Sequence, residues 1–151
     1  MNQPRIKQAR PQDAHGLSEL AHRSKGHWGY DHAFLAACKE NLTITHAYIK
    51  QNPVYVMNYG EEVYGFYSLL LEDEKLDFLY VNPDHIGEGI GRSLWQHIIE
   101  TAAKYGLQHF TIDSDPYAES FYLKMGARRI GEIPSTVFQY RKLPLLHVSV
   151  S

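Results

Sequence analysis

One glycine-rich turn constrains this chain more than any other feature of its sequence. An apolar run at residues 76–81 ends just before a turn that carries Gly87, Gly89 and Gly91. The turn leads directly into an amphipathic segment, residues 93–105, with the period of a helix. Glycines leave backbone N–H groups uncovered at a helix N-terminus, where the helix dipole favours negative charge. The turn therefore predicts a site for a phosphate-bearing cofactor.

Three kinds of phosphate-binding loop have closely spaced glycines, and the residues around this turn distinguish them. A P-loop ends in Gly-Lys followed by Ser or Thr, whereas Gly91 is followed by Arg92. A dinucleotide-binding fingerprint has the spacing G-x-G-x-x-G, whereas this chain has G-x-G-x-G in its middle. The third kind is written Q/R-x-x-G-x-G/A, and the segment 86–91 fits it except at the first position. A glycine-rich turn without a ligand remains the alternative at this point.

Length, charge and cysteine content narrow the class of protein. A chain of 151 residues has the size of one domain, and we expect residues 1–151 to form it. A net charge of −2 argues against nucleic-acid binding by phosphate neutralisation. The single cysteine, Cys38, excludes an internal disulfide framework and a cysteine-rich metal site. Because no apolar signal segment or membrane-spanning run is present, we expect a cytoplasmic protein without membrane contact.

Hydrophobic periodicity predicts the order of strands and helices. We expect strands at residues 5–9, 54–59, 63–71, 76–81, 109–112, 128–133 and 137–143. We expect four helices. The first begins at Pro11, the second runs from an Asp31 cap to about residue 40, the third spans residues 90–105 and the fourth spans about residues 118–125. The segment 24–30 breaks the first helical period and is expected to be a loop. The order β-α-α-β-β-β-α-β-α-β-β predicts one α+β domain with a mixed central sheet.

A second motif follows the strand expected at residues 109–112. It reads Asp115-Pro-Tyr-Ala118-Glu-Ser-Phe121-Tyr122-Leu-Lys124-Met-Gly126-Ala127. This motif, the glycine turn and the order of elements resemble the GCN5-related N-acetyltransferase (GNAT) family, whose pattern here is N-x-x-A-x-x-F/L-Y-x-K/R-x-G-F. The resemblance implies the GNAT fold, a mostly antiparallel mixed sheet flanked by helices, with acetyl-CoA as cosubstrate and no metal. Residues 115–135 and 27–31 are similar to a bacterial GNAT subgroup whose members mostly lack an assigned acceptor.

The resemblance also implies where the cofactor binds. The backbone of the fourth strand would hold the pantetheine arm, with an N–H near Leu79 polarising the thioester carbonyl, and the glycine turn would hold the pyrophosphate. The residues implied are Leu79, Tyr80, Val81, Ile86, Gly87, Glu88, Gly89, Ile90, Gly91, Arg92 and Asp115. Two of them depart from the family pattern. Ile86 replaces Gln or Arg, so we expect weaker cofactor binding, and Asp115 replaces Asn beside the pantetheine arm.

Acyl transfer to an amine needs a general acid and a base, and the resemblance identifies the acid. Tyr122 matches the family's usual acid, and a phenol protonates a departing thiolate within hydrogen-bond reach. Lys75 stands where some members carry a general-base Glu. Asp77 lies two residues further on, on the same strand face, and is our candidate base. A surface carboxylate or a partner for Lys75 is the alternative for Asp77.

The loop expected before the second helix is the acceptor wall in the GNAT fold. His27, Trp28, Tyr30 and Asp31 are therefore our candidate acceptor residues, and packing of this loop onto the domain is the alternative. The acceptor is expected to be a small-molecule amine or a peptide or protein amine, and a homodimer is possible. Two other functions remain in competition. One is a non-catalytic CoA-binding or regulatory module with the GNAT fold, and the other is a dinucleotide-binding reductase.

Overall fold

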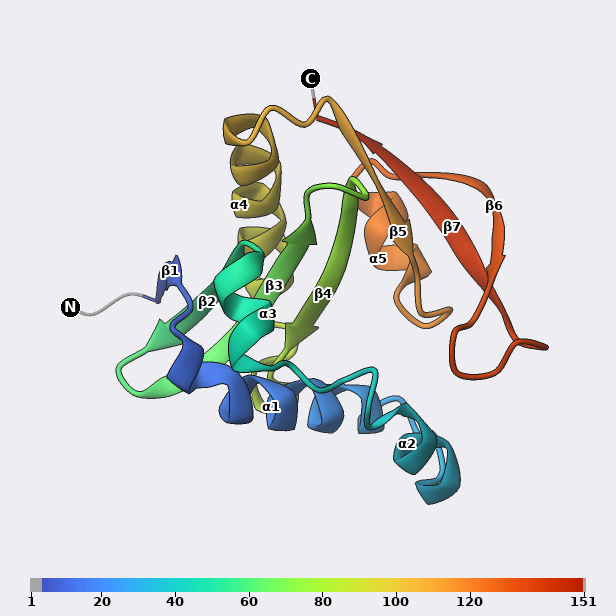
Figure 1. The fold of residues 1–151 in the computed structure, drawn as a ribbon, viewed down its shortest axis with the longest axis horizontal. Coiled ribbons are helices and arrows are strands. Elements are labelled where there is room, and N and C mark those ends of the chain that lie inside the picture. The colour runs from blue at the N-terminus through green and yellow to red at the C-terminus, as the bar shows by residue number, and fades with distance from the viewer. Residues whose placement is uncertain (1–3, 151) are drawn as a thin grey trace.

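The computed structural model describes residues 4–150, which form a sheet of seven strands with helices on both faces (Figure 1). The strands are β1 (Arg5–Gln8), β2 (Val54–Tyr59), β3 (Glu62–Leu70), β4 (Lys75–Val81), β5 (His109–Asp113), β6 (Arg128–Pro134) and β7 (Lys142–Ser149). Their order in the sheet is β1-β2-β3-β4-β5-β7-β6, and every neighbouring pair is antiparallel except β4 with β5. The expected α+β fold with a mixed, mostly antiparallel sheet is confirmed.

Five α-helices and two short 3-10 turns connect the strands of this region. They are η1 (Pro11–Asp13), α1 (Ala14–Gly26), α2 (His32–Cys38), α3 (His46–Gln51), η2 (Pro83–His85), α4 (Ile90–Lys104) and α5 (Glu119–Lys124). Successive residues of β3 face opposite ways, so Phe66 packs with α1 and α3 while Tyr67 packs with α4. The sheet is therefore the middle layer between two helical layers. Within the described residues, no helix has the length and apolarity needed to cross a bilayer.

The pairing of β4 with β5 ends almost as soon as it begins. Among residues 4–150 the two strands are in register at one position, Lys75 with Thr111, next to a bond from Thr111 N to Glu74 O of 2.9 Å. Beyond this point the strands diverge, as Figure 1 shows. One edge of β4 thus carries main-chain groups without a strand beside them.

Three local expectations differ from the structure. Three helices, not two, lie between β1 and β2, because α3 was not expected. It has six residues with Ile49 as its single buried side chain, too little for periodicity, and it begins at a Thr45 cap that accepts from Tyr48 N (3.0 Å). Helix α1 runs on to Gly26, into the segment expected to be a loop.

The last strand also differs, because it spans Lys142–Ser149 and not residues 137–143. Ser135 Oγ accepts hydrogen bonds from Val137 N (3.1 Å) and Phe138 N (3.2 Å), which folds that stretch into a turn. Pro144 has no N–H, yet it lies inside β7, where its carbonyl oxygen accepts from Ser114 N (2.9 Å). The alternation of buried residues then continues through Leu146 and Val148.

Candidate active site

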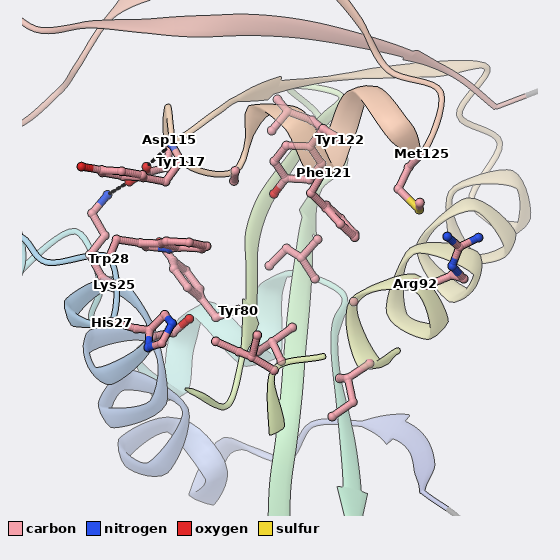
Figure 2. Close-up of a pocket in the computed structure, with 18 of the residues that line it drawn as sticks. Lys25, His27, Trp28, Tyr80, Arg92, Asp115, Tyr117, Phe121, Tyr122 and Met125 are labelled. Carbon is pink, nitrogen blue, oxygen red and sulfur yellow. Dashed lines mark hydrogen bonds and ion pairs between the residues drawn. The ribbon is translucent and has the colours of Figure 1, made fainter. Parts of the chain in front are cut away.

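A cleft of about 420 Å³ opens where β4 and β5 diverge, and most of the predicted site residues line it (Figure 2). Its walls come from the end of α1, strand β4, the loop before α4, the first turn of α4, and α5. The predicted residues that line it are His27, Trp28, Asp77, Leu79, Tyr80, Val81, Ile86, Gly87, Gly89, Ile90, Gly91, Arg92, Asp115 and Tyr122. Glu88, Tyr30 and Asp31 do not. Fold topology therefore brings the glycine turn and the second motif together.

The glycine turn takes the conformation that its composition predicts. Gly87 (φ 89°) and Gly89 (φ 81°) have left-handed backbone angles, which L-residues with a side chain rarely adopt. Gly89 is the N-cap of α4, a helix of 15 residues whose first N–H groups have no partner inside the helix. Both the dipole and these donors favour an anion at this end of the cleft.

Gly91 has a different role, because its backbone angle is ordinary. A Cβ at this position would lie 3.1 Å from the Phe121 ring, so the missing side chain lets α5 approach the start of α4. This contact joins the two motifs identified in the sequence. Ile86, at the position where the family pattern has Gln or Arg, is 49% exposed.

His85 ties the loop before α4 to strand β3. Its ring stacks on Tyr64 with centroids 3.9 Å apart, its Nδ1 lies 3.0 Å from Glu88, and its Nε2 lies 3.1 Å from Glu62. The Glu62 carboxylate first, and Glu88 beside it, raise the pKa of His85 against the opposing effect of burial. Glu88 is paired with His85 and does not line the cleft.

Tyr122 is nearly buried on α5, yet its side chain is directed into the cleft (Figure 2). Trp95 and Phe121 pack against its ring, with centroids 5.8 Å and 5.5 Å away. Burial, and secondarily the charge of Asp115, raise the pKa of the phenol above its usual range. The hydroxyl is therefore protonated at neutral pH, as a proton donor must be.

The two charged residues of β4 have different partners. Lys75 Nζ lies 2.8 Å and 2.7 Å from the two carboxylate oxygens of Asp113. Asp77 accepts a 2.5 Å hydrogen bond from the hydroxyl of Tyr48 and lines the cleft. Desolvation raises the pKa of Asp77, although the Tyr48 bond and Lys75 oppose it. A carboxylate with a raised pKa in a cleft is a candidate functional group.

One side of the cleft has an aromatic wall. Trp28 (41% exposed) and Tyr117 (53% exposed) stack in parallel, with ring centroids 5.6 Å apart. Asp31 caps α2 as expected, because its Oδ1 accepts from Phe34 N (2.8 Å), and it does not line the cleft.

A polar cluster behind this wall holds it in place. Asp115 accepts from Lys25 Nζ (2.7 Å), the Tyr30 hydroxyl (3.1 Å) and Tyr117 N (2.9 Å). Arg141 donates to the Tyr30 hydroxyl (2.6 Å). Tyr30 is therefore a support of the wall, and the charge of Asp115, expected beside the pantetheine arm, is met by Lys25.

Three contributors to the site were not predicted. Lys25 falls in the segment expected to be a loop, and Tyr48 belongs to the unexpected helix α3. His85 lies between the apolar run at residues 76–81 and the glycine segment at residues 86–91. The carboxylate of Glu88, three residues further on, was the one local signal for His85. In the part of the chain that the structure describes, no group of three or more His, Cys, Asp or Glu residues is arranged to hold a metal ion.

Comparisons with known proteins agree with this geometry. The family model described as "Acetyltransferase (GNAT) domain" matches residues 25–136, which is more than half of the chain. A curated relative, the peptidyl-lysine N-acetyltransferase YjaB of Salmonella typhimurium (strain LT2), is 37% identical over 71 residues. That match spans about half of each protein, 47% of this chain and 46% of the relative.

Two solved structures show the same fold over nearly the whole chain. A GCN5-related N-acetyltransferase from Rhodopseudomonas palustris has a TM-score of 0.80 at 20% identity, covering 99% of this chain and 97% of its own. The PaiA N-acetyltransferase of Thermoplasma acidophilum, solved with coenzyme A, has a TM-score of 0.77 at 16% identity, covering 97% and 99%. At these identities the likeness establishes the fold.

Proposed function

Because the chain belongs to the GNAT acetyltransferase family, we propose that residues 1–151 act as one domain that transfers an acetyl group from acetyl-CoA to a primary amine. The observation that carries this proposal is the meeting of two features in one cleft. The open edge of β4 runs directly into the glycine turn at the N-terminus of α4. An extended thioester arm that ends in a pyrophosphate fits such a groove.

The residues at these two features suit the cofactor. The N–H groups of Ile90, Gly91 and Arg92 at the start of α4 would donate to the pyrophosphate. The open edge of β4 at residues 79–81 would pair with the pantetheine arm. An exposed Ile86 offers the phosphates no side-chain donor, so the backbone of the turn provides most of the binding.

The proposed chemistry is direct attack by a neutral amine. The amine nitrogen forms a bond to the thioester carbonyl carbon, and the carbon–sulfur bond breaks. Asp77 accepts the proton that the amine loses, directly or through water, and the Tyr122 hydroxyl protonates the departing thiolate. A main-chain N–H near Leu79 stabilises the negative charge that develops on the carbonyl oxygen.

The acceptor is a primary amine that approaches along the wall formed by Trp28 and Tyr117. Aromatic faces attract cations and apolar side chains alike, so this wall suits an amine on an apolar stem. A lysine side chain in a peptide has this form, and the curated relative is a peptidyl-lysine N-acetyltransferase. Lysine peptides are therefore the first acceptors to test, beside small amines.

The test measures CoA release from acetyl-CoA with a panel of lysine peptides and small amines, and thermal unfolding with and without CoA. We expect turnover with at least one acceptor and a higher unfolding midpoint with CoA. The alternative, a non-catalytic CoA-binding module, predicts the shift in midpoint without turnover. The pairing of Lys75 with Asp113 is the observation that supports this alternative. Sedimentation of the same sample tests the possible homodimer.

A tyrosine variant tests the assignment of the general acid. Tyr122→Phe should lower kcat by about 10²-fold, because it removes one proton donor, and should leave CoA affinity unchanged. Tyr140→Phe, at the most exposed tyrosine of the described residues, is the matched control and should have no effect. An unchanged kcat in Tyr122→Phe would show that another group protonates the thiolate.

A further inference from the structure

The carboxylate of Asp77 lies at the end of a chain of hydrogen bonds that begins inside the sheet. Phe78 N donates to Ser68 Oγ (3.2 Å), and Ser68 Oγ lies 2.7 Å from the Tyr48 hydroxyl. The Tyr48 hydroxyl donates its single proton to Asp77 Oδ2 (2.5 Å). Ser68 must therefore donate to Tyr48, so all three bonds point the same way, toward Asp77. Aligned bonds of this kind polarise one another.

The Tyr48 side chain is held rigidly in this chain. Ser68 is fully buried in β3 and lies opposite Phe78 in the register with β4. The Thr45 cap fixes the backbone of Tyr48 in the first turn of α3, and the Tyr48 ring packs edge-on against Phe78. No side chain of the described residues forms a recorded hydrogen bond with Asp77 Oδ1. The carboxylate is thus held through one oxygen, and Asp77 also lines the cleft.

We propose that Tyr48 is a positioning residue for acetyl transfer, which holds Asp77 through Oδ2 so that Oδ1 faces the acceptor amine. This inference rests on the proposed function of Asp77 as the base. It assigns a role to helix α3, which does not itself line the cleft. The contact joins the helical layer on one face of the sheet to the reacting end of the cleft.

The charges around Asp77 determine the direction of the expected pH effect. Lys75 on the same strand lowers the pKa of Asp77, whereas Asp113 on β5 and Asp73 in the preceding turn raise it. The Tyr48 bond stabilises the carboxylate form and so also lowers the pKa of Asp77. Loss of the hydroxyl should raise the pH at which the base becomes active.

The experiment compares Tyr48→Phe with the wild type in kcat/KM for the amine across pH. Loss of a hydrogen bond to a carboxylate raises its pKa by about one unit when the site is partly open to water. The acidic limb of the pH profile should therefore move up by about one pH unit. The ratio of variant to wild type should rise with pH and then level off, because titration of the acceptor cancels in the ratio. KM for acetyl-CoA should not change.

Tyr67→Phe is the matched control, because its hydroxyl is also buried and hydrogen-bonded, to His97 and Thr101, but lies away from the cleft. It should lose stability without any shift in the acidic limb. A Tyr48→Phe/wild-type ratio that is constant across pH would overturn the proposal.

Two further measurements separate this inference from the proposed function. If Asp77→Asn has the same acidic limb as the wild type, then Asp77 is not the base and Tyr48 has no positioning role. A ¹³C NMR titration of the Asp77 carboxyl needs no acceptor and no turnover. We expect its pKa to be higher in Tyr48→Phe than in the wild type, and an unchanged value would contradict the inference even if acetyl transfer is confirmed.

Discussion

Gly89→Ala isolates the contribution of the glycine turn to cofactor binding. Gly89 has φ 81°, and a Cβ built on it has no atom within 4 Å. The added methyl group therefore causes no clash inside the protein, and its cost is conformational. A left-handed angle costs a residue with a Cβ roughly 1–2 kcal/mol. For a domain of this size that cost lowers the unfolding midpoint by roughly 2–8 °C.

Gly60→Ala provides the matched control for this strain. Gly60 also has a left-handed angle (φ 61°) and no atom within 4 Å of an added Cβ, but it lies in the turn between β2 and β3, outside the cleft. Both variants reduce the entropy of the unfolded chain equally, so that effect cancels between them. Their unfolding midpoints should fall by similar amounts.

Only Gly89→Ala should weaken CoA binding. The methyl group enters the space in front of the α4 N-terminus, and relief of the strain moves the N–H groups that would hold the pyrophosphate. We expect about a tenfold rise in Kd, which corresponds to about 1.4 kcal/mol. Isothermal titration with CoA measures it in both variants and the wild type. Equal CoA affinity in all three proteins would refute the assignment of this turn to the phosphates.

Two other changes test the contacts around the cleft. His85→Gln should destabilise the protein more at about pH 5.5 than at about pH 9. Folding raises the pKa of His85, so its protonated ring stabilises the protein fully below the pKa of the unfolded state, and this stabilisation is lost as pH rises through the pKa of the folded state. Urea unfolding at both pH values measures this difference, and a pH-independent one would contradict the Glu62–His85–Glu88 contact. Asp115→Asn leaves the charge of Lys25 (13% exposed) unpaired, so it should cost about 1–3 kcal/mol of stability. The same change should raise KM for the amine more than KM for acetyl-CoA. The control Asp113→Asn breaks the more exposed pair with Lys75 and should cost less than about 1 kcal/mol, so equal losses would argue against a special role for the cluster behind the wall.

The features that the sequence predicts correctly are local ones. The bounds of β2, the Asp31 cap of α2 and the turn at Gly89 each depend on a few consecutive residues. The family resemblance pointed to the backbone of residues 79–81, and these residues line one cleft together with Asp77. These properties follow from propensity, periodicity and glycine geometry, which a single segment expresses on its own.

The contacts that the sequence does not predict join residues far apart in the chain. Tyr48 and Asp77 are 29 residues apart, and Lys25 and Asp115 are 90 apart. From the sequence, Asp115 could be interpreted only against the Asn of the family pattern. The structure shows Lys25 and Tyr30 beside it, which turns an apparent departure at the cofactor site into the centre of a polar cluster. Such pairs depend on how separate elements pack, and no local pattern records them.

The short pairing between β4 and β5 has a mechanical consequence. Strands β1 to β4 and strands β5 to β7 form two halves of the sheet, and within residues 4–150 their ladders meet only at Lys75 and Thr111. Besides this short ladder, the side-chain pair of Lys75 with Asp113 also joins the two halves there, so bending about that point would change the width of the groove. An extended molecule bound along β4 would therefore lie between the two halves and hold the angle between them.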